Sequence, residues 1–172
     1  MDKKTTAQGS SSTTNLAALL PITARILLLC AYLASHNPSK QDLTLFSTYH
    51  YGRKRRRGGF SSKFGVSRKG PKHRKIARKL LGAHAFVLER MLAIFEAARL
   101  EWVEDTKIGH NGLDGDVGMA LATLASLRLL TRVGVGGDVM DRAGKWRINV
   151  GWEVVRVLGR SMGVEVEEWL IE

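Results

Sequence analysis

The chain of 172 residues contains one cysteine, so neither an internal disulfide bond nor a zinc site built from cysteine thiolates can form. That cysteine, Cys30, lies in an apolar stretch without a basic neighbour, which predicts an inert buried thiol. The five histidines are far apart, and none lies three or four residues from another, the spacing that places two ligands on one helix face. We therefore interpret them as histidines of loops or helix ends and predict no metal site. They are His36, His50, His73, His84 and His110.

The chain also lacks an uninterrupted hydrophobic run long enough to span a membrane. Its longest apolar stretch, residues 16–34, contains Arg25, and a charge inside a membrane-spanning helix costs roughly 2.5–3.5 kcal/mol. Pro21 interrupts the same stretch, whereas a signal peptide needs an unbroken apolar core. The sequence therefore favours a buried helix over membrane insertion or secretion, and we expect no membrane partner.

No residues have the spacing of a catalytic or cofactor-binding site. Residues 65–70 carry the two glycines of a phosphate-binding loop, but that motif requires Lys and then Ser or Thr after the second glycine. Here Pro71 and Lys72 follow. The aspartates within residues 114–116 and 138–141 lie in glycine-rich stretches, where Asp is typical of turns and helix caps. We therefore predict no catalytic residue, no cofactor and no metal, and we do not expect an enzyme.

Acidic residues are missing from one long segment. Between Leu43 and Leu88 the chain carries 13 of its 27 Lys and Arg residues and no Asp or Glu, while the remainder has 14 basic against 16 acidic residues. This charge density predicts a polyanionic partner, first of all DNA, whose phosphates are bound through counterion release without regard to base sequence. The thirteen predicted DNA-binding residues of this segment are Arg53, Lys54, Arg55, Arg56, Arg57, Lys63, Arg68, Lys69, Lys72, Arg74, Lys75, Arg78 and Lys79.

The same basic residues permit two other interpretations. A stretch rich in Lys and Arg is also typical of a nuclear localisation signal, and DNA contact and nuclear import can both hold. A solvated loop is the third interpretation, but it does not account for the absence of negative charge. We therefore predict DNA as a partner and the nucleus as the location.

Hydrophobic periodicity predicts a mostly α-helical chain. Residues 1–18, rich in Ser, Thr and Gln, are expected to be a disordered tail. A helical segment is predicted over residues 19–47, in which an apolar helix runs from Ile22 to Ser35 and ends before Pro38. Residues 48–84 show no apolar period and are expected to form a flexible basic loop.

Residues 85–172 are predicted to form a winged-helix domain. Apolar residues recur at helical spacing from Phe86 to Trp102, a second helix is expected from Val117 to about Leu130, and a last helix from Trp152 to Met162. A β-hairpin is expected between the second and last helices. The predicted fold class is therefore mostly α, with a helical segment followed by a winged helix-turn-helix with a β-hairpin wing.

The wing is predicted from a change of the hydrophobic period to two. One strand is expected over residues 146–150, with its partner near 130–135. Three residues should face the core: Trp146, Ile148 and Val150. The alternating residues should face solvent or DNA: Lys145, Arg147 and Asn149. Lys145 and Arg147 therefore complete the predicted DNA-binding residues.

The helix predicted over residues 117–130 has the position of a recognition helix. Base reading in the major groove uses mainly Arg, Lys, Asn and Gln. This stretch contains small residues such as Gly118, Ala122 and Ser126, and Arg128 is its one base-reading side chain. We predict a poor base reader that is suited to close packing against protein or to contact with DNA shape.

Two separated sequence blocks carry a resemblance to a known family. The first block is Ala31-Tyr-Leu-Ala-Ser-His-Asn-Pro38 with Asp42 and Phe46. The second is Leu80-Leu-Gly82 followed by Phe86-Val-Leu-Glu-Arg-Met-Leu-Ala-Ile-Phe95. In this order they resemble subunit 5 of the eukaryotic origin recognition complex, from about Leu20 to the C-terminus. The resemblance implies the helical part and the winged helix that follow an ATPase domain, and a non-catalytic role in assembling with other subunits on DNA in replication initiation.

Two rival functions remain open at this point. A stand-alone winged-helix DNA-binding regulator would need a base-reading helix, and the composition of residues 117–130 counts against it. A winged-helix protein-interaction module whose basic stretch is only a nuclear localisation signal would show no salt-dependent binding to DNA. A titration of DNA affinity against salt separates this second rival from the subunit interpretation.

Overall fold

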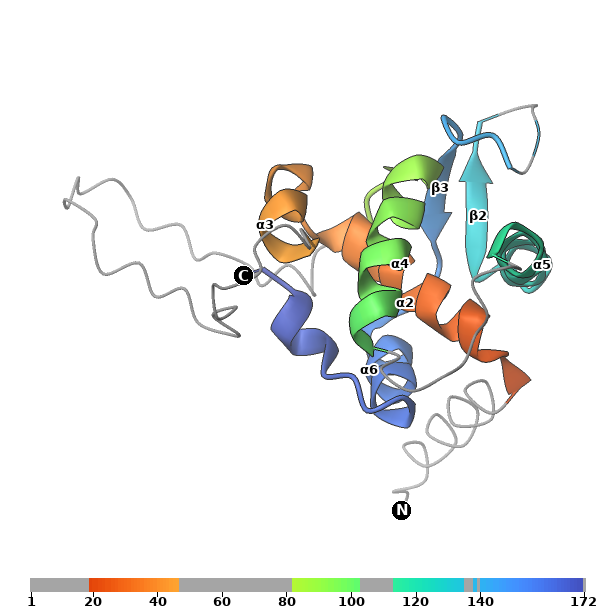
Figure 1. The fold of residues 1–172 in the computed structure, drawn as a ribbon. Coiled ribbons are helices and arrows are strands. Elements are labelled where there is room, and N and C mark those ends of the chain that lie inside the picture. The colour runs from red at the N-terminus through yellow and green to blue at the C-terminus, as the bar shows by residue number, and fades with distance from the viewer. Residues whose placement is uncertain (1–18, 47–81, 103–112, 135–137, 139, 172) are drawn as a thin grey trace, which may run out of the picture.

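The described part of the chain forms helices around a small antiparallel sheet in the computed structural model (Figure 1). The described residues are 19–46, 82–102, 113–134, 138 and 140–171. The predicted tail over residues 1–18 lies outside them. So does the predicted basic loop over residues 48–84, except for Gly82, Ala83 and His84.

Helix α2 (Ile22–His36) lies at the centre of the fold, and every residue from Ile26 to His36 is buried. Pro21 precedes it in an extended conformation, and its missing N–H costs nothing at a helix start, where the first N–H groups have no intrahelical partner. Asn37 is extended before Pro38 and ends the helix. The predicted apolar helix is confirmed, one residue longer than expected.

Three short strands form the sheet in the order β1-β3-β2, all antiparallel. The strands are β1 (Phe86–Val87), β2 (Leu130–Val133) and β3 (Lys145–Ile148). Strands β2 and β3 are the predicted wing hairpin. Strand β1 was not predicted, because Phe86 and Val87 continue the helical spacing of the apolar residues that follow them. A strand of two residues is too short to show a period of two, and only its pairing with Trp146 and Lys145 defines it.

Three further helices follow the predicted order: α4 (Leu88–Trp102), α5 (Leu113–Ser126) and α6 (Trp152–Ser161). Helix α5 begins four residues before the predicted Val117 and ends before the predicted Leu130. It ends in a left-handed turn, because Arg128 has φ 56° and the N–H of Leu129 donates to the carbonyl of Leu124 at 3.0 Å.

One hydrophobic core joins α2 to the sheet and to helices α4, α5 and α6. The division into a helical segment at 19–47 and a winged helix at 85–172 therefore does not describe the packing. Helix α2 is the first helix of the winged helix, and β1 is its first strand. A helix that is apolar on most sides needs partners on most sides, and these come from elements far along the chain that periodicity alone does not identify.

Short elements close the two ends of the described chain. A 3₁₀ turn η1 (Ser39–Gln41) and helix α3 (Asp42–Phe46) follow α2, and the 3₁₀ turn η3 (Val166–Trp169) follows α6. Turn η3 packs closely on α6 at Gly159, where a Cβ atom would lie 2.5 Å from Cγ2 of Val166. Figure 1 shows α3 and the C-terminal segment on the side of the molecule opposite α5.

Candidate nucleic-acid interface

Lys145 and Arg147 are the two predicted DNA-binding residues that the structure describes. Both are exposed on β3, whereas Trp146 and Ile148 between and beside them are only 2% and 3% exposed. The predicted alternation of core and solvent faces is thus confirmed along β3. Val150, which was predicted to face the core, follows the end of the strand and is half-buried against the core.

The outer face of the sheet carries these two cations in register with uncharged residues. Lys145 lies between Val87 of β1 and Val133 of β2, and Arg147 lies opposite Thr131 of β2. Among the described residues, neither Lys145 nor Arg147 forms an ion pair with a carboxylate. An anion that approaches this face therefore meets positive charge without local competition.

The other thirteen predicted DNA-binding residues, Arg53 to Lys79, lie outside the described residues. We call residues 53–79 the basic segment. The described chain resumes shortly after it at Gly82, and the carbonyl of Ala83 accepts a hydrogen bond from Nε of Arg147 at 3.4 Å. The chain that follows the basic segment therefore enters the fold beside the basic outer face of the sheet.

Two further exposed cations lie in turns next to strands of the sheet and were not among the predicted site residues. Arg142 lies in the turn before β3, and Arg128 lies in the turn after α5. Arg132 points to the other side of the sheet, where it pairs with Asp141 at 3.3 Å. The sequence does carry a signal for this basic region, because residues 128–149 contain five Lys and Arg residues and only two Asp residues.

Helix α5 presents a surface of a different kind. Its exposed residues include Asp116, Met119, Ala122 and Ser126, and its sequence contains no Lys or Arg. The hydroxyl of Ser126 donates to a carbonyl of its own helix at 2.8 Å. Arg128, which was predicted to lie on this helix, lies in the turn beyond it. The helix thus lacks the long polar side chains that read bases in the major groove.

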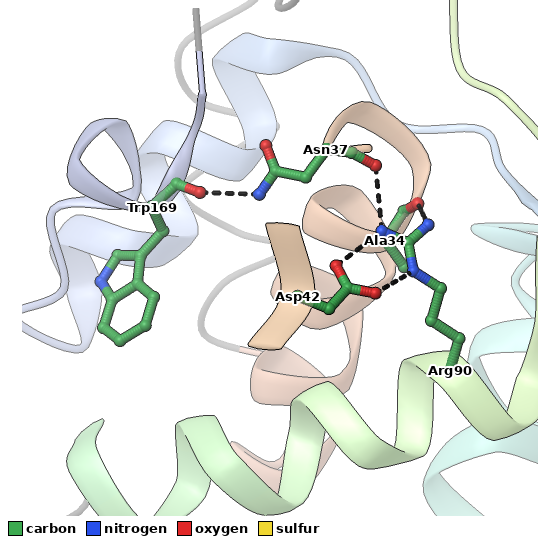
Figure 2. A network of polar contacts seen from close by, with 5 residues as sticks. All are labelled: Ala34, Asn37, Asp42, Arg90 and Trp169. Atoms are coloured by element: carbon green, nitrogen blue, oxygen red, sulfur yellow. Dashed lines mark hydrogen bonds and ion pairs between the residues drawn. The ribbon is translucent and has the colours of Figure 1, made fainter. Parts of the chain in front are cut away.

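A cluster of polar contacts surrounds Arg90 of α4 (Figure 2). Its Nη1 donates to the carbonyl of Ala34 at 2.6 Å and its Nη2 to the carbonyl of Asn37 at 2.9 Å. Nε and Nη2 also donate to the two carboxylate oxygens of Asp42, at 2.6 and 2.8 Å. Arg90 thus satisfies carbonyl groups that the end of α2 leaves without intrahelical partners, and Asp42 balances its charge.

The same cluster extends to the C-terminal segment. The side-chain amide of Asn37 donates to the carbonyl of Trp169 at 2.7 Å (Figure 2). The side-chain oxygen of Asn37 accepts from the N–H of Ile171 at 3.1 Å. The ring of Trp169 stacks on Phe46 and meets Trp102 edge-on. Asn37 is buried, so these bonds offset the cost of removing its amide from water. The cluster therefore joins α2, α3, α4 and the C-terminus, and its role is structural.

Two residues that were considered as a reactive thiol or as a metal ligand, Cys30 and His36, are buried. Cys30 is fully buried, and desolvation raises the pKa of its thiol, as expected of an inert thiol. His36 was predicted to lie in a loop or at a helix end; it ends α2, but it is buried and stacks on Tyr32. Within the described residues there is no group of three or more potential metal ligands. No helix among them combines the length and apolar character needed to cross a membrane.

Comparison with known proteins decides the family. The sequence family described as origin recognition complex subunit 5 C-terminus matches residues 20–170. The chain belongs to this family. It is 32% identical over 153 residues to origin recognition complex subunit 5 of Drosophila melanogaster, 27% identical over 153 residues to the human subunit 5, and 31% identical over 161 residues to that of Schizosaccharomyces pombe.

These matches cover 88–89% of this chain but only 30–34% of each subunit 5 relative. Among solved structures, the chain resembles one in the Drosophila origin recognition complex bound to DNA, with a TM-score of 0.56 and 28% identity over 87% of this chain and 27% of that chain. Asn37, Asp42 and Arg90, three residues of the blocks that resembled subunit 5, meet in the polar cluster of Figure 2. In this chain those residues hold the fold together.

Proposed function

We propose that this chain is a non-catalytic C-terminal module of an origin recognition complex subunit 5. In this role it assembles with other subunits of the complex in the nucleus and contacts DNA in replication initiation. Membership of the family over residues 20–170 supports this role, and so does the likeness to a chain of an origin recognition complex bound to DNA. The relatives are named as subunits of a replication complex and have no enzymatic name, which supports a module without catalysis or cofactor.

The proposed DNA contact combines the basic segment with Lys145 and Arg147 and uses phosphates only. The observation that carries it is the hydrogen bond from Arg147 to Ala83, because Ala83 follows the basic segment by four residues in the sequence and lies beside the outer face of the sheet. Each phosphate that a Lys or Arg neutralises contributes about 0.9 to the slope of log affinity against log salt. Such contacts position a protein on DNA without reading its sequence.

The experiment measures DNA affinity against salt for the purified chain on two duplexes of unrelated sequence. Replacement of Arg53, Arg55, Arg56 and Arg57 by alanine should flatten the salt slope by roughly 3–4 units if each residue holds one phosphate. Replacement of the same four residues by lysine should retain much of the binding, because point charge is sufficient for a phosphate contact. The loss should be equal on both duplexes.

The two β3 cations are tested with a matched pair of variants. Lys145→Ala with Arg147→Ala should flatten the salt slope by up to about 2 units. Arg156→Ala with Arg160→Ala removes two positive charges from α6, which Figure 1 shows at the other end of the molecule from β2 and β3, and should leave the slope nearly unchanged. If neither the four-arginine variant nor the β3 variant changes the slope on either duplex, the DNA role fails. The basic segment would then be a nuclear localisation signal of a protein-interaction module.

A further inference from the structure

Thr131 lies on the outer face of the sheet, next to a cation that is proposed to contact DNA. It belongs to β2 and pairs directly with Arg147 of β3. Side chains that face each other across an antiparallel strand pair have their Cβ atoms about 4.5–5.5 Å apart. A negative group attached to Thr131 would therefore lie within reach of the guanidinium of Arg147.

Two further residues adjoin the hydroxyl of Thr131. Nδ2 of Asn149 donates to Oγ1 of Thr131 at 3.3 Å and to the carbonyl of Arg128 at 3.0 Å. Arg128 has φ 56°, a left-handed conformation that residues other than glycine adopt rarely. The bond from Asn149 holds this turn against the start of β2. Arg128, Thr131 and Asn149 therefore lie together at one corner of the sheet.

The hydroxyl of Thr131 is accessible for reaction. Thr131 is half-buried, and both contacts of its hydroxyl are exposed to solvent. Its bond to the carbonyl of Arg147 measures 3.5 Å, which is long for a hydroxyl donor, so little is lost when it is replaced. Strand β2 has four residues and lies at an edge of the described sheet, where local opening is cheap.

The sequence before Thr131 has the charge pattern of a kinase substrate. Arg128 lies three residues before Thr131, and no other Ser or Thr of the 172-residue chain has an Arg at this distance. Protein kinases select their substrates by such charge patterns, and a class of them requires Arg at this position. The one residue that carries this signal is thus the residue that pairs with Arg147 on the outer face.

We propose that Thr131 is a phosphorylation site for a protein kinase that selects Arg three residues before its target, and that its phosphate displaces DNA from the outer face of the sheet. This inference rests on the proposed DNA contact and adds its regulation. Oγ1 of Thr131 forms a bond to the γ-phosphorus of ATP, the bond from that phosphorus to the oxygen of ADP breaks, and the hydroxyl proton passes through the kinase to solvent.

The product carries the same chemical group that DNA would bring to this face. A phosphothreonine has a charge of about −1.5 to −2 at pH 7 and three acceptor oxygens. Arg147 bonds to Ala83 through Nε, so its two Nη atoms can donate to those oxygens. An intramolecular phosphate needs no second molecule, and it therefore competes with a DNA phosphate at high effective concentration.

The first experiment tests the modification itself. The folded chain is incubated with ATP and a purified calmodulin-dependent protein kinase, and mass spectrometry locates the phosphate. Thr131 should be modified, and Arg128→Gly should reduce the rate at least about tenfold, because glycine keeps the left-handed turn but removes the guanidinium. A synthetic peptide of residues 125–134 is the control for recognition without the fold. No transfer to Thr131 of the folded chain, or an equal rate in Arg128→Gly, would overturn the proposal.

The second experiment tests the effect on DNA, with phosphothreonine incorporated at position 131 during synthesis of the chain. Loss of one or two phosphate contacts should flatten the salt slope by about 1–2 units and weaken binding roughly 10- to 100-fold at about 0.1 M salt. Phosphoserine at Ser161 is the matched control, because Ser161 is exposed at the end of α6, which Figure 1 shows at the other end of the molecule from β2 and β3. The control should stay within about threefold of the unmodified chain.

The Arg147→Ala chain separates occupation of the cation from damage to the strand. If the phosphate acts by occupying Arg147, phosphothreonine at position 131 should weaken DNA binding at least about fivefold less in Arg147→Ala than in the wild type. An equal loss in both chains would overturn the proposal. Absence of salt-dependent DNA binding by the unmodified wild type would instead refute the proposed function, and this failure is seen before any phosphate is introduced.

Discussion

Replacement of Arg90 by alanine tests the polar cluster that joins α2, α3, α4 and the C-terminus. The change removes both hydrogen bonds to Asp42 and leaves the carbonyls of Ala34 and Asn37 without a guanidinium donor. The side chains of Arg90 and Asp42 are 21% and 24% exposed, so water screens the pair only in part. Removal of one partner from a fully buried pair costs about 3–5 kcal/mol, and with this exposure we expect about 2–4 kcal/mol.

The assay is urea unfolding of the purified chain, with the free energy of unfolding taken from the midpoint and the m-value. A double-mutant cycle with Asp42→Ala should give a coupling energy of about 1–2 kcal/mol, because the two side chains form a bidentate pair. Arg90→Lys should recover part of the loss, since an ammonium group does not reproduce the planar fork. Arg160→Ala, an exposed arginine of α6, is the control and should change stability by less than about 0.5 kcal/mol. A cost below about 1 kcal/mol for Arg90→Ala would refute the structural role of the cluster.

Two further predictions concern the core. Trp146→Ala should cost roughly 3–5 kcal/mol in urea unfolding, because Trp146 lies on the central strand β3 and is 2% exposed. A cost under about 1 kcal/mol would contradict its burial. Burial raises the pKa of Tyr32 from 10.0 to about 12, so the unfolded chain ionises first and stability should fall as pH rises from about 10 to 12. Tyr32→Phe should lessen that fall and should not destabilise the chain at neutral pH, because the hydroxyl is buried without a hydrogen-bond partner. An unchanged pH dependence in Tyr32→Phe would assign the fall to other groups.

Local patterns in the sequence were sufficient to predict much of the fold. The apolar run after Pro21 predicted α2, and the alternation around Trp146 predicted both the strand β3 and the direction of its side chains. These features depend on near neighbours in the chain, which is why periodicity detects them. The C-terminal half of the winged helix was predicted for the same reason.

The features that the sequence did not predict depend on contacts between distant residues. The membership of α2 in the winged-helix core requires its packing against α4 and α5, which follow the basic segment. Strand β1 is defined only by its pairing with β3. Arg90 appeared as one polar residue on an amphipathic helix, and nothing in its spacing indicated that it binds carbonyls of α2.

The basic residues of the candidate DNA-binding site could be predicted from the sequence, but their neighbours in the fold could not. The net charge of a segment follows from its residues alone, so the sequence was sufficient to predict the basic segment and the two β3 cations. The approach of the hairpin to α5 could not be found in this way, because Gly118 and Met140 are neighbours only in the fold, where a Cβ atom on Gly118 would lie 3.8 Å from Sδ of Met140. The lack of base-reading side chains on α5 can be recognised from the sequence. The surface that α5 forms with its neighbours can be recognised only from the fold.

The charges of the folded elements favour DNA contact at the sheet over DNA contact at α5. Residues 128–149, which include β2 and β3, contain five Lys and Arg against two Asp, whereas α5 contains two Asp and no basic residue. The net positive charge of residues 128–149 attracts phosphates, and α5 itself supplies no positive charge. Because Lys and Arg on phosphates do not distinguish bases, this module should add affinity for DNA without adding sequence preference. Any preference of a complete assembly for particular sequences would then have to arise from DNA shape or from other parts of that assembly.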